Sequence, residues 1–349
     1  MAEYSMFDSP VKIYGLAVAE PGKIRRLTDD VFDKVNDGVT GLSWHTAGGR
    51  LRFRTDADKI GIKYALRDSP NMSHMAFSGS SGVDCYFEEG SGAYGSFGTM
   101  FSGCTHPEIG KKEVAGEFWR RNYPKNSGVV DVTLNLPLYN GVESLTLTLP
   151  DGAVIEPPTP YEIEKPIVFY GSSITQGGCA SKPSNAYTSI IAEKLRADHI
   201  NLGFSGSARG EETICRYIAG LCMSCFVMDY DHNAPDADHL RRTHLPFYKI
   251  IREAQPDLPI IFVGRPDYET WLDDSEKRAE VILDTFSYAV NNGDRNVYYV
   301  PGRDLFEREM RGHCTVDGCH PTDLGFWRMA QVIGEAVTKA INGNDIREI

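Results

Sequence analysis

The chain has 349 residues, of which 41% are hydrophobic and 24% are charged, and its formal net charge is −12. This composition is that of a folded globular protein, and the length is sufficient for two ordinary domains. The acidic balance and the lack of a Lys/Arg-rich run argue against nucleic acid or anionic membrane surfaces as partners. No apolar stretch of the sequence approaches the roughly 20 residues that span a bilayer.

Residues 1–8 show neither the basic segment nor the apolar segment of a secretory signal. We therefore expect a cytoplasmic protein, or a secreted or periplasmic one if a signal peptide has been removed. The sequence makes no prediction about the oligomeric state.

Short alternating strands are predicted in the first part of the chain. Apolar and polar side chains alternate in residues 51–55, 60–64, 130–136 and 145–149, and Gly, Asp and Asn turns separate these segments. Such alternation, with one apolar face, is typical of an antiparallel β-sandwich. We expect a β-sandwich domain over residues 1–155, followed by a stiff proline-rich linker over residues 156–166.

Apolar strands alternate with helices in the remaining part, residues 167–349. Strands are predicted at 167–170, 225–228, 259–263 and 297–300, and helices at 186–195, 276–291 and 324–341. Strands that are apolar on both faces and alternate with helices indicate a parallel sheet covered on each side. The second domain is therefore predicted to be of the α/β class.

A carboxylate and an imidazole lie three residues apart near the C-terminus. Asp317 can sit beside the ring of His320, fix its tautomer and stabilise the cation that forms when the ring takes a proton. Ser173 lies in a Gly-flanked turn after the predicted strand 167–170, which suits an exposed nucleophile. The three side chains predict a hydrolytic triad, with Ser172 as the competing nucleophile.

Candidate oxyanion donors follow neighbouring strands, at the sheet edge where functional residues of open parallel sheets gather. Gly206 follows the expected second strand, and Asn233 follows the strand 225–228. The backbone N–H groups of Ser173 and Gly206 and the side-chain amide of Asn233 could stabilise a developing oxyanion. Asn233 could instead cap a turn before Pro235.

Two further polar residues are expected at the same edge. His232 precedes Asn233 and could contact substrate or stabilise a turn, while Arg265 follows the strand 259–263 and could orient a polar substrate or form a salt bridge within its loop. We assign both to substrate binding.

Eight cysteines are spread along the chain, and we expect most of them to be free thiols in or near the core. Cys222 and Cys225 have the spacing of a metal or redox motif. A structural zinc site needs four ligands, usually from a second pair, so we expect both to be buried and predict no metal site. Cys319, between Asp317 and His320, could make the site sensitive to oxidation.

These stretches resemble, in chain order, the four sequence blocks of the SGNH (GDSL-like) hydrolases. The residues that match are Ser173, Gly206, Asn233, and the pair Asp317 and His320. The first block usually reads Gly-Asp-Ser, and here Ser172 stands for the aspartate; the third usually reads Gly-Asn-Asp, of which the asparagine remains. The resemblance implies a flavodoxin-like three-layer α/β/α fold and a triad mechanism that needs no cofactor.

Residues 82–86, Gly-Val-Asp-Cys-Tyr, are similar to the Gly-x-Asp-Leu-Tyr signature of a jelly-roll-like β-sandwich domain that precedes some bacterial SGNH hydrolases. Cys85 replaces the leucine. This architecture implies an esterase that acts on acylated, often acetylated, carbohydrates, so the expected partner is a small-molecule or oligosaccharide ester.

Two other functions stay open. A lipase or thioesterase would need an extended apolar channel for a long acyl chain, whereas residues 179–185 and 231–238 are polar and rich in Gly and Pro. The altered first and third blocks are also compatible with a carbohydrate-binding protein that has lost its hydrolase activity.

Overall fold

The computed structural model describes residues 1–69, 72–88, 99–120 and 128–343, which form two compact units. The sandwich unit consists of residues 1–28, 43–162 and 180–185, and the α/β unit of residues 29–42, 163–179 and 186–349. The predicted domain limits, with a linker over residues 156–166, stay a prediction.

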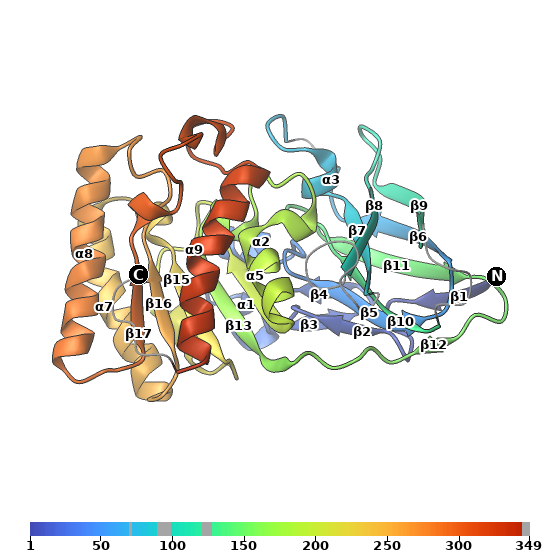
Figure 1. Cartoon of the computed structure of the whole chain (residues 1–349), viewed down its shortest axis with the longest axis horizontal. Helices are drawn as coiled ribbons and strands as arrows, with labels where there is room; N and C mark the ends of the chain where they lie inside the picture. Colours follow the sequence, from blue (N-terminus) through green and yellow to red (C-terminus); the bar gives the residue numbers. More distant parts are fainter. Residues whose placement is uncertain (70–71, 89–98, 121–127, 344–349) are drawn as a thin grey trace. The chain divides into compact units, whose positions relative to one another are not determined.

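The sandwich unit contains two antiparallel sheets and a short hairpin (Figure 1). Its elements are β1 (Ala2–Ser5), β2 (Lys12–Tyr14), β3 (Val18–Glu20), β4 (Lys23–Arg25), β5 (Arg50–Thr55), β6 (Lys59–Leu66), α3 (Phe77–Ser80), β7 (Val83–Glu88), β8 (Thr99–Thr105), β9 (Glu113–Trp119), β10 (Val130–Asn135), β11 (Val142–Leu149) and β12 (Ile155–Glu156). One sheet has the order β1-β11-β6-β9, and the other has the order β12-β5-β10-β7-β8, with β2 also paired to β5.

Alternation of side chains builds the core between these sheets. In β6, Ile60, Ile62 and Tyr64 are buried while Lys63 is exposed, and Ile62 pairs with the buried Leu147 of β11. Apolar residues at every second position therefore give each strand one face in the core. The predicted antiparallel β-sandwich is confirmed.

The Gly-Val-Asp-Cys-Tyr motif has a structural explanation within the sandwich unit. A Cβ atom on Gly82 would lie 2.3 Å from the carbonyl oxygen of Ser78, so only glycine fits there. Asp84 is fully buried and accepts hydrogen bonds from the Asn135 side chain (2.7 Å) and from the Ser184 backbone N–H (2.8 Å). Burial raises the pKa of Asp84 despite these bonds and the nearby Lys182. The carboxylate thus anchors residues 180–185.

The α/β unit follows the predicted alternation of strands and helices. Its elements are α1 (Asp29–Phe32), α2 (Asp37–Leu42), β13 (Ile163–Gly171), α4 (Ser173–Gln176), α5 (Tyr187–Leu195), β14 (Ala197–Gly203), α6 (Glu212–Ala219), β15 (Cys225–Asp229), α7 (Ala237–Ala254), β16 (Ile260–Val263), α8 (Leu272–Asn291), β17 (Val297–Val300) and α9 (Asp323–Ile341). Asn36 joins the α1–α2 excursion to this unit through a hydrogen bond to Glu211 (2.7 Å).

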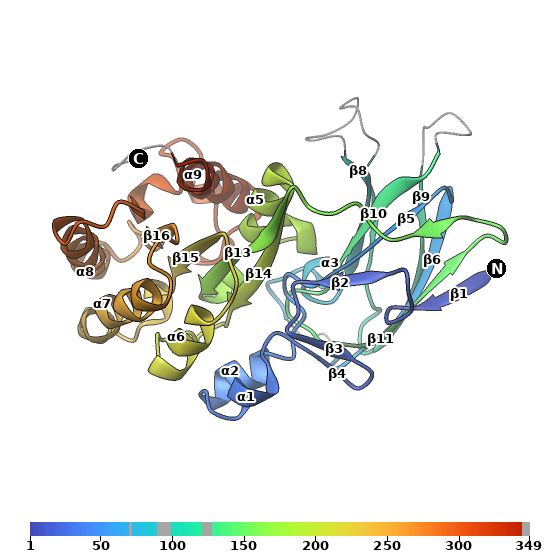
Figure 2. The ribbon, with the colours of Figure 1, turned by 90° about the horizontal axis from the view of Figure 1, so that it is seen from below.

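The parallel sheet has the strand order β14-β13-β15-β16-β17. Helices α5 and α9 cover one face, while α6 and α7 cover the other (Figure 2). This is the flavodoxin-like doubly wound order. The chain adds β14 on one side of β13 and the later strands on the other side, and ligands of such folds bind at this switch point, between β13 and β15. The predicted three-layer α/β/α fold is confirmed.

Helices α6 and α7 and the exposure of Cys222 differ from the sequence expectation. Helix α7 was not predicted because Pro246 interrupts its apolar pattern. The proline lies on the exposed side of the helix, so the Arg242 carbonyl, which loses its backbone hydrogen bond, can bind water instead. The prediction that Cys222 is buried was wrong. Cys225 is buried inside β15, whereas Cys222 is exposed in the turn between α6 and β15.

Glycine permits the close packing that places α4. A Cβ atom on Gly203, at the end of β14, would lie 2.1 Å from the backbone nitrogen of Gln176. The short helix therefore rests directly on the sheet edge. No helix within the described part of the chain is long and apolar enough to cross a membrane.

Candidate active site

Ser172 and Ser173 have different structural tasks. Ser172 is the N-cap of α4, and its Oγ accepts the backbone N–H of Ile174 at 3.1 Å. This bond satisfies one of the free N–H groups at the helix start. Ser173 begins the helix at the carboxyl end of β13, and its Oγ lies 3.0 Å from Nε2 of His320.

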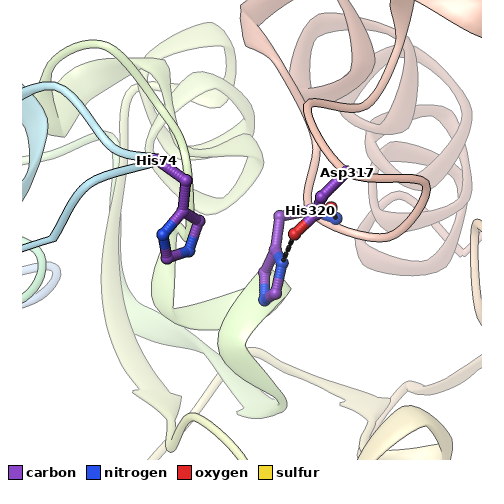
Figure 3. Close-up of side chains that lie close together, drawn as sticks. All are labelled: His74, Asp317 and His320. Carbon is purple, nitrogen blue, oxygen red and sulfur yellow. Dashed lines mark hydrogen bonds and ion pairs between the residues drawn. The ribbon is translucent and has the colours of Figure 1, made fainter.

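The Ser173 hydroxyl, the His320 imidazole and the Asp317 carboxylate form a continuous hydrogen-bonded chain. Oδ2 of Asp317 lies 2.7 Å from Nδ1 of His320. Figure 3 marks this hydrogen bond with a dashed line. The ring can therefore donate from Nδ1 while its Nε2 accepts the Ser173 proton. His74, also drawn there, belongs to the sandwich unit. The structure thus brings together the three residues that the sequence predicted as a triad.

The turn at residues 317–320 holds this geometry. Oδ1 of Asp317 accepts the backbone N–H groups of Cys319 (3.0 Å) and His320 (2.7 Å). Gly318 has a φ of +84°, a conformation that favours glycine. One carboxylate therefore fixes both the ring and the backbone that carries it.

Electrostatics in the turn favour an ionised carboxylate and a protonated ring. Burial alone would raise the pKa of Asp317, but hydrogen bonds from the His320 ring and from two backbone N–H groups hold it below its ordinary value. Contact with the Cys319 thiol, opposed by burial and assisted by Asp317, raises the pKa of His320 to about 9.

Besides Ser173 in α4, the proposed oxyanion donors Gly206 and Asn233 lie on the segments after β14 and β15. Asn233 donates one amide hydrogen to the Phe204 carbonyl (2.9 Å), which leaves a second hydrogen on the same nitrogen. Gly206 lies two residues after Phe204 with a φ of +67°, and its N–H has no partner among the described residues. Both groups are thus available as donors.

Asp229 is a buried carboxylate that stabilises this edge of the sheet, and the sequence analysis did not identify it as a site residue. Asp229, the last residue of β15, accepts hydrogen bonds at Oδ2 from Tyr187 (2.7 Å) and Thr175 (3.0 Å). It therefore ties α4 and α5 to the central strand. Burial raises the pKa of Asp229 to about 7. The sequence feature that could have indicated Asp229 is its position at the end of a predicted apolar strand.

A second group of ionisable side chains adjoins the turn. Nε2 of His232 lies 3.1 Å from Oδ2 of Asp267 and 3.3 Å from the sulfur of Cys319. Arg265 binds both carboxylate oxygens of Asp267 at 2.8 Å and also contacts Asp274 at 3.0 Å. We call His232, Arg265, Asp267 and Cys319 the His232 cluster. A role of His232 and Arg265 in substrate binding stays a prediction.

The His232 cluster includes donor atoms of the kinds that bind metals. The His232 nitrogen, an Asp267 oxygen and the Cys319 sulfur lie within 4.8 Å of one another. The Arg265 guanidinium, however, engages both oxygens of Asp267 and lies 3.5 Å from the same His232 nitrogen. A positive charge thus already neutralises the carboxylate, and we interpret the cluster as an ion-pair network.

Comparison with protein families decides the identity of both parts of the chain. Residues 164–338 match the GDSL-like lipase/acylhydrolase family, and residues 3–155 match the N-terminal domain of SGNH-hydrolase-type esterases named for its Gly-x-Asp-Leu-Tyr motif. The chain belongs to the GDSL-like lipase/acylhydrolase family. No curated protein matches it in sequence.

Solved structures share the fold of this GDSL-like hydrolase over nearly its whole length. A protein from Bacteroides ovatus ATCC 8483, named a GDSL-like lipase, has a TM-score of 0.84 at 23% identity, covering 98% of each chain. A salicylyl-acyltransferase from a tetracycline biosynthetic pathway has a TM-score of 0.77 at 19% identity over 99% of each chain. An acetyl xylan esterase from the rumen bacterium Butyrivibrio proteoclasticus has a TM-score of 0.59 at 13% identity over 98% of each chain.

The site geometry accounts for one departure from the usual blocks. Ser172, which stands where the family usually has aspartate, still supplies an oxygen to cap α4. Serine and aspartate are comparably good N-caps, so this substitution keeps the helix start that carries Ser173. At the position after Asn233, where the family usually has an aspartate, the chain has the buried Ala234.

Proposed function

We propose that this hydrolase is a serine esterase that removes short acyl groups, chiefly acetyl, from O-acylated carbohydrates. The observation that carries the proposal is the continuous chain from Ser173 through His320 to Asp317, with contacts of 3.0 and 2.7 Å. A serine nucleophile needs a base within this reach, and the base needs an orienting partner.

In the proposed reaction, Nε2 of His320 takes the Ser173 proton as Oγ attacks the ester carbonyl carbon. Negative charge then develops on the carbonyl oxygen, where the N–H groups of Ser173, Gly206 and Asn233 stabilise it. The imidazolium returns its proton to the leaving alcohol, and an acyl-enzyme remains. Water repeats the sequence on the acyl-enzyme and releases the carboxylate.

Short acyl groups are favoured by the surroundings of the turn. A cavity of about 540 Å³ adjoins Asp317, and its wall includes Asp267, Glu269 and Arg311 besides Phe306 and Val316. Charged walls suit water and sugar hydroxyls better than a long alkyl chain, which needs a predominantly apolar site. The fold likeness to an acetyl xylan esterase supports the carbohydrate part of the proposal.

The proposal is tested by the choice of substrate. We expect the protein to release acetate from peracetylated xylose and to hydrolyse nitrophenyl acetate at least tenfold faster, by kcat/KM, than nitrophenyl octanoate. A preference for the octanoate would favour a lipase or thioesterase. Binding of acetylated xylan without release of acetate would favour an inactive carbohydrate-binding protein. Heat-inactivated protein serves as the control for spontaneous hydrolysis.

A further inference from the structure

The Cys319 thiol lies between two imidazoles beside the proposed triad. Its sulfur is 3.3 Å from Nε2 of His232, and it is partly exposed. Other charged or titratable groups lie nearby: His232 after β15, Asp267 after β16 with its ion-pair partner Arg265, Cys179 after α4, and Asp317 and His320 in the same turn.

Imidazolium contacts stabilise a thiolate at this position. Burial opposes ionisation, but contacts with His232 and His320 outweigh it and lower the pKa of Cys319 to about 7. The carboxylate of Asp267 in turn favours the protonated form of His232, whose pKa is raised to about 10 although burial opposes it. Because the thiolate is the reactive form of cysteine, such surroundings mark a reactive thiol.

Other cysteines of the chain offer a direct contrast. Cys179 is also near the turn but is buried, and burial raises its pKa to about 12. Cys222 is exposed but lies in the turn before β15, with no imidazole contact among the described residues. Partial exposure and a contact with imidazole therefore coincide at Cys319.

We propose that Cys319 is a modification site at which a peroxide oxidises the thiolate and reversibly switches off the hydrolase. The effect on activity rests on the proposed esterase function, whereas the reactivity of the thiol does not. In the reaction the sulfur attacks one peroxide oxygen, an S–O bond forms and the O–O bond breaks. The sulfur loses two electrons to become a sulfenic acid, and the departing hydroxide takes a proton to become water.

Oxidation at this sulfur would disturb the proposed triad directly. The backbone N–H of Cys319 donates to Oδ1 of Asp317, and its side chain contacts the ring system of both histidines. An added oxygen has to find room in this half-buried turn, and a shift of about 1 Å in a catalytic group can reduce turnover about a hundredfold. A thiol reductant removes the oxygen as water and restores the cysteine.

The thiol itself is tested first, on the full chain at pH 7. Dilute hydrogen peroxide is added with dimedone, which traps sulfenic acids, and the label is mapped by mass spectrometry. We expect labelling at Cys319 and not at Cys179 or Cys222. The variant His232→Asn should label at least tenfold more slowly, because it removes the imidazolium. Labelling elsewhere, or a His232→Asn rate equal to the wild-type rate, overturns the proposal.

The effect on activity is tested with nitrophenyl acetate after peroxide treatment without dimedone. Wild type and the controls Cys179→Ser and Cys222→Ser should lose at least nine-tenths of their activity and regain it with dithiothreitol, while Cys319→Ser keeps its own starting activity. Equal losses in Cys319→Ser, or full activity in oxidised wild type, overturn the switch. If untreated protein hydrolyses no ester although Cys319 is labelled, the proposed function fails instead.

Discussion

At the scale of single residues, one imidazole is subject to two opposing demands. In the proposed mechanism His320 has to be neutral to accept the Ser173 proton, yet contacts with Cys319 and Asp317 favour its protonated form and raise its pKa to about 9. A general base works best when its pKa lies near the working pH. We therefore expect the pH dependence of the activity to depend largely on Cys319, the residue before the histidine.

The acidic limb of the activity profile should reflect this raised pKa. Neutral His320 becomes scarcer as pH falls below about 9, so kcat/KM for nitrophenyl acetate should decline with a midpoint well above 6.5, the ordinary pKa of histidine. Cys319→Ser removes the largest cause of the rise, so its midpoint should move to lower pH, while Cys222→Ser should match wild type. An unchanged midpoint in Cys319→Ser would contradict this explanation.

Asn233 should matter for turnover more than for binding. Its amide is proposed to contact the oxyanion, which exists only along the reaction path, so Asn233→Ala should lower kcat by about 10²–10³ and leave KM nearly unchanged. Steady-state kinetics with nitrophenyl acetate measure both. Asn292→Ala, at the end of α8, is the matched control. A change confined to KM would assign Asn233 to ground-state binding.

At the scale of elements, the sequence predicted β5, β6, β10 and β11 of the sandwich unit, the strands of the α/β unit, and the helices α5, α8 and α9. Alternation in β6 and β11 and the apolar runs of β15 and β17 are strong local signals. Helix α7 was not predicted because Pro246 interrupts its apolar pattern. The contacts of Asp229 with α4 and α5 and the grouping of the His232 cluster were not predicted either, because the partners come from separate segments of the chain and no local pattern records which segments meet.

Asp84 provides an element-scale test of stability. Asp84→Ala would leave the Asn135 amide and the Ser184 N–H buried without an acceptor, so the free energy of unfolding should fall by about 2 kcal/mol or more. Asp84→Asn, which retains one acceptor oxygen, should lose less. Urea unfolding of the three proteins measures both differences. Equal stability of Asp84→Ala and wild type would show that the motif is not an anchor.

At the scale of the whole molecule, the family and the fold follow from the chain, but the natural substrate does not. The fold likeness extends to an acyltransferase as well as to an acetyl xylan esterase, and one fold can support several acyl-transfer reactions. In the mechanism proposed for this chain, a serine carries the acyl group before water receives it. The central claim is therefore that Ser173, and not its neighbour Ser172, carries the acyl group.

The most direct test compares Ser173→Ala with Ser172→Ala in acetate release from nitrophenyl acetate, after both variants are shown to be folded. Ser173→Ala should lose at least three powers of ten in kcat/KM, as expected when a triad serine is removed. Ser172→Ala should lose about 1 kcal/mol of stability through the helix cap and keep its kcat/KM within tenfold of wild type. The reverse pattern, or an active Ser173→Ala, would contradict the account.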